Sequence, residues 1–209
     1  MTNLLFVGGS LLMNQGIPTI VGHIYKKLSG SSCKILFVGW NGASLQEHLE
    51  KNSFSNFISK SHSSIVIFQE KGTIPYERPN EFRDSLIKCS QIVNGYGAST
   101  SVIFPWPNLK YDNRNSNQLS IYKNITSEAR VSLIDINSPW QKLDNYYGRD
   151  FLFPNHDNHP SFLGATFASI LIIKSIFPMF EPKIQHLPAD ISSVQGHSLI
   201  NLAKGQYAS

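Results

Sequence analysis

Short, continuously apolar runs recur along the chain, separated by longer segments in which apolar and polar residues follow a helical period. A run that is apolar at every position, rather than at every second one, is typical of a strand covered by helices on both faces. Such strands in regular alternation with helices indicate an α/β fold built on a doubly wound, parallel sheet of five strands. The predicted strands are Leu4–Val7, Ile35–Val38, Ile65–Phe68, Ser101–Phe104 and Val131–Asp135.

Helices are predicted in the segments between these strands. The second of them should begin with a capping box, because Glu47 follows Ser44 by three residues. Asn80, directly ahead of Glu81, gives the third helix a similar start. The predicted helices are Pro18–Leu28, Ser44–Lys51, Asn80–Val93, Ser116–Ser127 and one that follows Ser161.

The most apolar stretch, Phe167–Phe180, is shorter than the roughly 20 residues that a membrane span needs, and Lys174 and Pro178 interrupt it. We therefore expect a core helix there and no membrane span. A chain of 209 residues can bury a substantial core, so residues 1–180 are predicted to form one α/β domain. Residues 181–209, with a short helix over 191–203, are expected either to pack on that domain or to mediate association.

Charged residues make up only 15% of the chain, and hydrophobic residues make up 41%. The 18 lysines and arginines give a net charge of +4 but are scattered singly, so binding of nucleic acid, which usually needs a basic stripe, is not expected. The N-terminus runs straight into a strand without a basic leader, which predicts a cytoplasmic location. Cys33 and Cys89 lie outside any metal-binding or redox motif and are expected to be buried free thiols.

Polar groups follow the first three predicted strands. Ser10 follows the first strand after two glycines, and a serine there is either an ordinary turn residue or a nucleophile. Asn41 and Gly42 follow the second strand and could donate hydrogen bonds to an oxyanion, although a loop with an N-cap explains them equally well. Gln69 places an amide directly after the third strand. Because the carboxyl ends of parallel strands meet in one crevice, we expect these groups to lie close together.

A turn late in the chain holds two imidazoles and one carboxylate, those of His156, Asp157 and His159. A serine hydroxyl is a poor nucleophile unless an imidazole takes its proton, and a carboxylate that holds the imidazole assists the transfer. The turn and Ser10 together therefore suggest a nucleophile and its base. The remaining histidines are expected in surface or capping roles: His23, His48, His62, His186 and His197.

These blocks resemble those of the SGNH/GDSL hydrolases, over nearly the whole chain and in the right order. That family has a serine after strand one, a glycine after strand two, an amide residue after strand three and a D-x-x-H-P turn before the last helix. The chain is most similar to bacterial members that read GNS, GGASL, LQEQS and HPS in these blocks. The corresponding segments here are Gly8–Ser10, Asn41–Leu45, Phe68–Gly72, and His159–Ser161 with Gly164.

The resemblance implies a flavodoxin-like sheet and an acyl-transfer site that needs no metal or cofactor. Ser10 would be the nucleophile and His159 its base. The oxyanion would be held by the Ser10 backbone N–H, by Gly42 and by Gln69. Asn41 and His156 are secondary candidates.

Two positions depart from the family's pattern. Gly9 stands where the family usually has Asp or Asn before the serine. His156 stands three residues before the base, where the family has its acid, and the nearby carboxylate of Asp157 is only two residues before His159. Asp157 is our candidate for the orienting acid. The alternatives are a Ser-His dyad, at a cost of about 10⁴ in turnover, and a site that no longer hydrolyses.

The function that the resemblance implies is hydrolysis of a small-molecule or glycan ester, such as an acetyl group on a sugar, through an acyl-enzyme. The same site could instead pass the acyl group to an acceptor, as in an O-acyltransferase, or the chain could be a non-catalytic glycan-binding protein. The last alternative predicts that His159 lies out of reach of Ser10, or that Asp157 points into solvent. The sequence does not predict the acyl chain, the alcohol or the oligomeric state.

Several aromatic residues could either bind carbohydrate or pack under loops. They are Trp40, those in segment 74–79, Trp106, Tyr146 and Tyr147.

Overall fold

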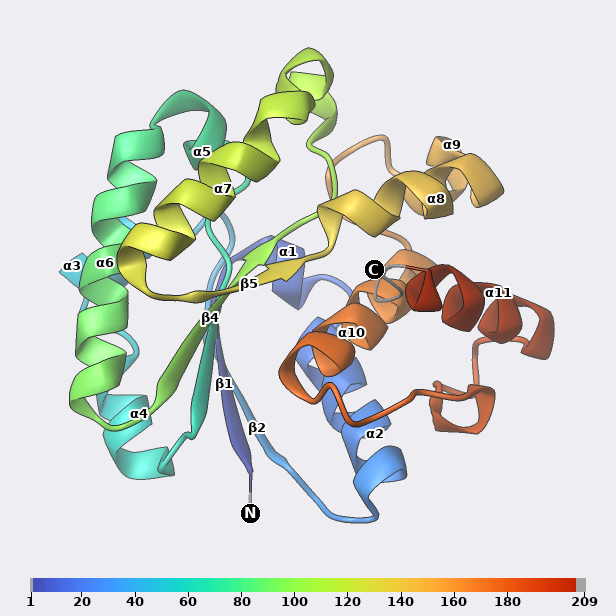
Figure 1. Ribbon diagram of the computed structural model, residues 1–209, viewed down its shortest axis with the longest axis horizontal. Helices are drawn as coiled ribbons and strands as arrows, with labels where there is room; N and C mark the ends of the chain where they lie inside the picture. Colours follow the sequence, from blue (N-terminus) through green and yellow to red (C-terminus); the bar gives the residue numbers. More distant parts are fainter. Residues whose placement is uncertain (1, 206–209) are drawn as a thin grey trace.

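Five parallel strands form the central sheet of the protein, in the order β2-β1-β3-β4-β5 (Figure 1). The computed structural model describes residues 2–205, apart from the side chains of residues 112–116. All four pairings between neighbouring strands are parallel, which confirms the predicted doubly wound sheet. The strands are β1 Asn3–Gly8, β2 Lys34–Gly39, β3 Ile65–Phe68, β4 Ser99–Phe104 and β5 Ser132–Asp135.

Helices cover both faces of the sheet (Figure 1). One layer contains α2 and α10, and the other contains α3, α6 and α7. The helices are α1 Ser10–Met13, α2 Ile17–Ser29, α3 Leu45–Glu50, α4 Ser55–Ser61, α5 Ile74–Glu77, α6 Pro79–Gly95, α7 Asn115–Ala129, α8 Asn137–Tyr147, α9 Arg149–Leu152, α10 Phe162–Ile176 and α11 Ser193–Lys204, with 3-10 segments η1 Leu109–Arg114 and η2 Ile184–His186.

The central strand β1 has a core on each of its faces. Leu4 and Phe6 belong to the core cluster under α2 and α10, whereas Leu5 and Val7 belong to the cluster under α6 and α7. All four side chains are fully buried, because successive residues of a strand point to opposite faces of the sheet. This explains why the run is continuously apolar.

Glycines set the place where β1 and β2 end. Gly8 and Gly39 are partners in the parallel ladder, and a Cβ atom on Gly39 would lie 2.0 Å from the Gly8 carbonyl oxygen. No side chain fits there while the two strands stay paired. The chain turns away from the sheet directly after these two residues, which is where the candidate site begins.

Three details of the local sequence predictions can be judged against the structure. The capping box at Ser44 is confirmed, because its Oγ accepts from the Glu47 backbone N–H while Glu47 accepts from the Ser44 N–H at 2.8 Å. The predicted cap at Asn80 is wrong: α6 begins one residue earlier at Pro79, whose fixed φ angle suits the first helical position. Both cysteines are free, but only Cys89 is buried and Cys33 is half-buried.

The C-terminal segment packs on the same core as the rest of the chain. Leu187, Ile191 and Leu199 are buried in the cluster that also holds α10, and α11 contacts both α8 and α10. Residues 206–209 of the segment lie outside the described part of the chain.

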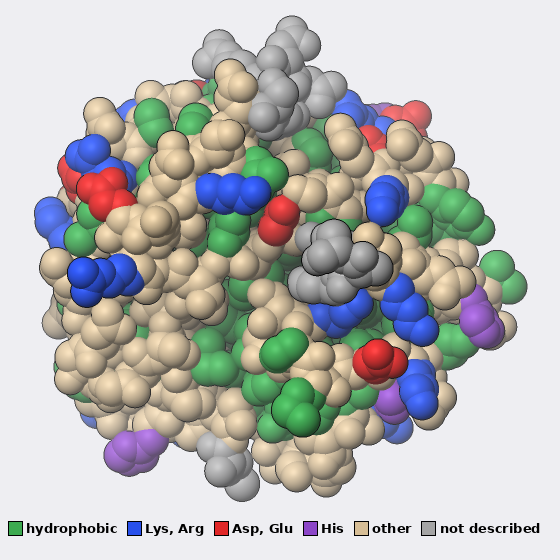
Figure 2. Space-filling view, viewed as in Figure 1, with side chains coloured by type: hydrophobic (Ala, Val, Ile, Leu, Met, Phe, Trp, Pro, Cys, Tyr) green, Lys and Arg blue, Asp and Glu red, His purple; other side chains and the backbone are tan. Residues whose placement is uncertain are grey.

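On the face in Figure 2, lysines and arginines lie in several separate places, interspersed with acidic side chains. In the described residues, no helix combines the length and apolar character needed to cross a membrane.

Candidate active site

Ser10 occupies the first position of the short helix α1, directly after β1. Gly9 is the N-cap residue, with an extended backbone at φ −119° and ψ −152°. Leu11 and Leu12 follow and are buried, so they anchor the helix while the Ser10 side chain stays partly exposed. The strand therefore delivers the hydroxyl to the carboxyl edge of the sheet.

His159 reaches Ser10 from the other end of the chain. Its Nε2 atom lies 2.9 Å from Ser10 Oγ, and its Nδ1 atom lies 3.0 Å from Asp157 Oδ2. An ionised carboxylate can only accept, so Nδ1 carries the hydrogen and Nε2 accepts from the serine. The His159 side chain is 26% exposed and that of Asp157 is 46% exposed, so solvent reaches both.

Asp157 can contact the His159 ring from only two residues away because the turn folds back on itself. Asp157 Oδ1 accepts from the His159 backbone N–H at 2.8 Å, while Oδ2 contacts the ring. Short Asp side chains readily bond the backbone two residues on. Hydrogen bonds from the His159 side chain, and then from its backbone, lower the pKa of the Asp157 carboxyl, which therefore stays charged beside the imidazole.

Asn158, between these two residues, fixes the turn to the loop after β4. Its Oδ1 accepts from the Leu109 backbone N–H at 2.8 Å, and its Nδ2 donates to Asn108 Oδ1 at 3.0 Å. Its carbonyl oxygen accepts from Trp106 Nε1 at 2.8 Å. Trp106 is only 4% exposed and packs against Trp140, so it supports the turn rather than offering a surface to a sugar.

Gln69 holds the loop that carries the serine. Its Oε1 accepts from the Gly9 N–H at 3.1 Å, and its Nε2 donates to the Glu70 carbonyl oxygen. An amide has two hydrogens on nitrogen, so one of them is left for another acceptor. Gly9 itself packs closely, since a Cβ atom there would lie 3.3 Å from the Ala43 carbonyl oxygen. The glycine before the serine thus lets the loops after β1 and β2 approach each other.

Backbone donors from two loops meet at the same cavity. Gly42 has a left-handed backbone, with φ of +72°. Among the described residues, neither its N–H nor that of Ser10 has an acceptor. The cavity has a volume of about 270 Å³. Its lining includes every member of the predicted catalytic and oxyanion sets: Ser10, Gly42, Gln69, Asp157 and His159.

The two secondary candidates lie elsewhere. Asn41 is exposed and does not line the cavity. His156 is also exposed, with φ of +53°, and its Nδ1 lies 3.8 Å from the exposed Asp150 carboxylate. Its left-handed backbone lets the turn reverse direction just before Asp157. Of the remaining aromatic candidates, Trp40, Tyr146 and Tyr147 do not line the cavity either.

His48 has a structural role that the sequence did not reveal, and its assignment to a surface or capping role is wrong. It is fully buried on α3, with Nε2 3.2 Å from the Gly8 carbonyl oxygen and Nδ1 2.6 Å from Ser53 Oγ. Burial lowers the pKa of its imidazole. The neutral ring therefore braces the end of β1, two residues before Ser10.

Glu70 is a buried carboxylate behind the cavity. Its Oε1 accepts from the Leu45 backbone N–H at 3.2 Å and from the Lys71 backbone N–H at 2.7 Å. It therefore joins the start of α3, which follows the Gly42 loop, to the loop after β3. Burial raises the pKa of its carboxyl to about 7.

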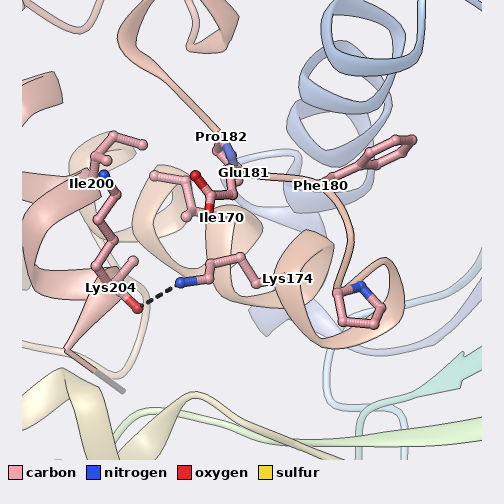
Figure 3. Close-up of a pocket in the computed structure, with 9 residues that line it drawn as sticks. Ile170, Lys174, Phe180, Glu181, Pro182, Ile200 and Lys204 are labelled. Atoms are coloured by element: carbon pink, nitrogen blue, oxygen red, sulfur yellow. Dashed lines mark hydrogen bonds between the residues drawn. The ribbon is translucent and has the colours of Figure 1, made fainter. Parts of the chain in front are cut away.

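A larger cavity of about 450 Å³ lies between α10, α11 and the segment that joins them (Figure 3). Lys174 borders it and donates to the Ala203 carbonyl oxygen at 3.0 Å. Its lining shares no residue with the cavity at Ser10. Convergent polar groups mark a reactive site better than volume does, so we place the candidate site at Ser10. Among the side chains that the structure describes, no three His, Cys, Asp or Glu residues are grouped to hold a metal ion.

Comparison with solved structures identifies the fold. A protein from Slackia heliotrinireducens that is assigned to the SGNH hydrolases matches with a TM-score of 0.69 and 19% identity, over 84% of this chain and 98% of its own. An acetyl xylan esterase from Geobacillus stearothermophilus matches with a TM-score of 0.67 and 13% identity, over 84% and 94%. A DUF4886 family protein from Bacteroides uniformis matches with a TM-score of 0.72 and 12% identity, over 98% and 93%.

No family model and no curated protein sequence matches the chain. The structural matches establish that it has the fold of the SGNH hydrolases.

Proposed function

We propose that the protein is a serine ester hydrolase of the SGNH type that forms an acyl-enzyme on Ser10. The observation that carries the proposal is the relay of hydrogen bonds from Asp157 through His159 to Ser10, at 3.0 and 2.9 Å. Within hydrogen-bond reach, an imidazole oriented by a carboxylate is the arrangement that activates a serine. For a non-catalytic protein we expected His159 to be out of reach of Ser10, or Asp157 to point into solvent. The distances argue against both, because the Asp157 carboxylate, although 46% exposed, contacts His159 through both oxygens.

In the proposed reaction, Ser10 Oγ attacks the ester carbonyl carbon while its proton passes to His159 Nε2. The negative charge that develops on the carbonyl oxygen is stabilised by the N–H groups of Ser10 and Gly42 and by the remaining Nε2 hydrogen of Gln69. Asp157 stabilises the imidazolium. The intermediate then expels the alcohol, which takes the proton from His159. Water, deprotonated by the same imidazole, releases the carboxylic acid and restores Ser10.

Hydrolysis is favoured over transfer to an acceptor alcohol because the base is open to water. His159 and Asp157 are 26% and 46% exposed, whereas transfer to another alcohol requires that water be kept from the acyl-enzyme. A small acyl group such as acetyl suits a cavity of about 270 Å³. Acetyl xylan esterases share the fold, which supports an acetylated carbohydrate or another small alcohol as the substrate.

Fluorophosphonate labelling and hydrolysis of short-chain chromogenic esters test the proposal. We expect wild type to be labelled, and Ser10→Ala to lose both labelling and at least about 10³ of turnover. Ser127→Ala is a matched control, since Ser127 is exposed on α7. Labelling that persists in Ser10→Ala, or a wild type that is neither labelled nor active, would contradict the proposal.

A further inference from the structure

One wall of the cavity carries a positive charge that the proposed acyl transfer does not use. Lys71, Gly72 and Thr73, from the loop after β3, all line the cavity. The Lys71 side chain is half-buried, and its ammonium forms no ion pair among the residues that the structure describes. Hydrogen bonding by the Ser44 backbone N–H, and to a smaller extent the charge of Lys71, lower the pKa of the Glu47 carboxyl. Lys71 and Glu47 are not within ion-pair distance, so the ammonium can still bind a ligand.

Hydrogen-bond donors line the same cavity as Lys71. Thr73 precedes α5, but its hydroxyl makes no capping hydrogen bond to the helix. Within the described part of the chain, the backbone N–H groups of Gly72 and Thr73 have no acceptor either. The Gly72 carbonyl oxygen is already bound by Asn108 Nδ2 at 2.9 Å. The wall therefore offers an ammonium, a hydroxyl and backbone amides, which are groups that bind anions.

The other charges near this wall are already engaged. Asp157, the carboxylate that lines the cavity, accepts two hydrogen bonds from His159. Lys71 also borders a neighbouring groove, where Glu47 is bound to Ser44 in the capping box, Glu50 accepts from Gln46, and Glu81 pairs with Arg78. Lys71 and Asp157 carry opposite charges, but the Asp157 oxygens already accept from His159, so the ammonium is the charged group on this lining that is left for a ligand.

We propose that the ester substrate carries an anionic group, such as a carboxylate, a few bonds from the scissile carbonyl, and that Lys71 and Thr73 bind it. The inference rests on the proposed esterase function and narrows its substrate class. Lys71 lies two residues after Gln69, the proposed oxyanion donor, and both residues line the cavity. A neutral acetyl ester would make no use of this ammonium.

Two matched pairs of esters test the inference. The mono-para-nitrophenyl ester of succinate carries its charge on the acyl side, and para-acetoxybenzoate carries it on the alcohol side. Each is compared with its methyl-capped, neutral counterpart after subtraction of the spontaneous rate. The readout is the ratio of kcat/KM for the charged ester to that for its neutral counterpart. This ratio does not depend on how well a variant folds.

We expect wild type to prefer the charged member of one pair by about 10-fold or more, the usual effect of a charge-assisted hydrogen bond. The ratio should fall to near one in Lys71→Met and below one in Lys71→Glu. Lys88→Met, which removes an exposed lysine from α6, should keep the wild-type ratio. The pair that shows the preference tells whether the charge belongs to the acid or to the alcohol.

Two results would overturn the inference while the esterase proposal stands. One is hydrolysis of both pairs by wild type without preference for the charged member. The other is a preference that persists in Lys71→Glu. If wild type hydrolyses no ester and fluorophosphonate does not label Ser10, the esterase function itself is wrong, and the inference falls with it.

Discussion

Asn158 Nδ2 donates to Asn108 Oδ1 over 3.0 Å, so the turn that carries the proposed base is fastened to the loop after β4. Asn108 in turn donates to the Gly72 carbonyl oxygen, in the loop after β3. Two side-chain amides thus join three loops that the sheet brings to one edge. Among the described residues, these amides form no hydrogen bond to Ser10 or to the His159 ring, and we infer that they position the base.

Asn158→Ala should lower kcat by about 10- to 100-fold with little change in KM. Reorientation of His159 weakens proton transfer more than substrate binding, and small misplacements of a catalytic group are costly. The loss of buried hydrogen bonds should also lower the free energy of unfolding by about 1–3 kcal/mol. Steady-state kinetics and urea unfolding measure both effects. Asn124→Ala, at an exposed site on α7, is the control, and a wild-type kcat in Asn158→Ala would rule out the positioning role.

Asp157→Asn distinguishes a triad from a dyad. The variant keeps the size of the side chain but removes the charge that stabilises the imidazolium, so we expect kcat to fall by up to about 10⁴. A fall of less than about 10-fold would show that His159 works as part of a dyad. Asp150→Asn serves as the control, because the Asp150 side chain is 91% exposed. Since the pKa of Asp157 is lowered, titration of this carboxyl should not shape the pH profile of wild type near neutral pH.

The fold could be predicted from the sequence because its signal is strong. The central strand β1 is buried on both faces, so every position from Leu4 to Val7 had to be apolar. The 11-residue helix α8 was not predicted, and the other unpredicted helices, such as α4, α5 and α9, span only four to seven residues. Such short helices contain too few turns for a periodic pattern to be recognisable.

The candidate residues could be found for a different reason: a nucleophile, a base and amide donors stood at strand ends or in a late turn. Asn108 and Asn158 could not be found this way, because an asparagine in a loop is ordinary and its partner lies 50 residues away. His48 was missed because a buried histidine in a short helix looks the same in sequence as an exposed one. The contact that gives it a role, to Gly8, lies across the fold.

Stability should fall as pH rises from about 4.5 to 7 through the titration of Glu70. Burial raises the folded-state pKa of this carboxyl from 4.5 to about 7, so in that window the folded protein holds a proton that the unfolded chain has released. The shift corresponds to about 3 kcal/mol, lost progressively as the pH rises. Glu70→Gln remains neutral and keeps an acceptor oxygen. The free energy of unfolding of this variant, measured relative to that of wild type, should therefore rise by a similar amount between pH 4.5 and 8.

Urea unfolding of wild type and Glu70→Gln across this pH range measures the difference directly. The two buried titratable groups that interact with Glu70 do not contribute to this difference. Burial raises the pKa of the Cys89 thiol and of the Tyr122 hydroxyl, so both stay neutral throughout. Glu128→Gln, at an exposed glutamate on α7, is the control for removal of a carboxyl. A constant difference between Glu70→Gln and wild type at every pH would mean that Glu70 ionises normally in the folded protein.

Gly39→Ala should destabilise the protein by roughly 2–4 kcal/mol, because the added Cβ would lie 2.0 Å from the Gly8 carbonyl oxygen and must push β1 and β2 apart. The same displacement would move Gly9 and Ser10, so esterase activity should fall even where the variant remains folded. Gly95→Ala is a matched control. Gly95 ends α6 with open space around it, so a Cβ there meets nothing within 4 Å and should stabilise the helix by up to about 1 kcal/mol. Thermal unfolding of the two variants should give shifts of opposite sign. Equal shifts would show that the close approach of the two strands does not limit the residue at this position.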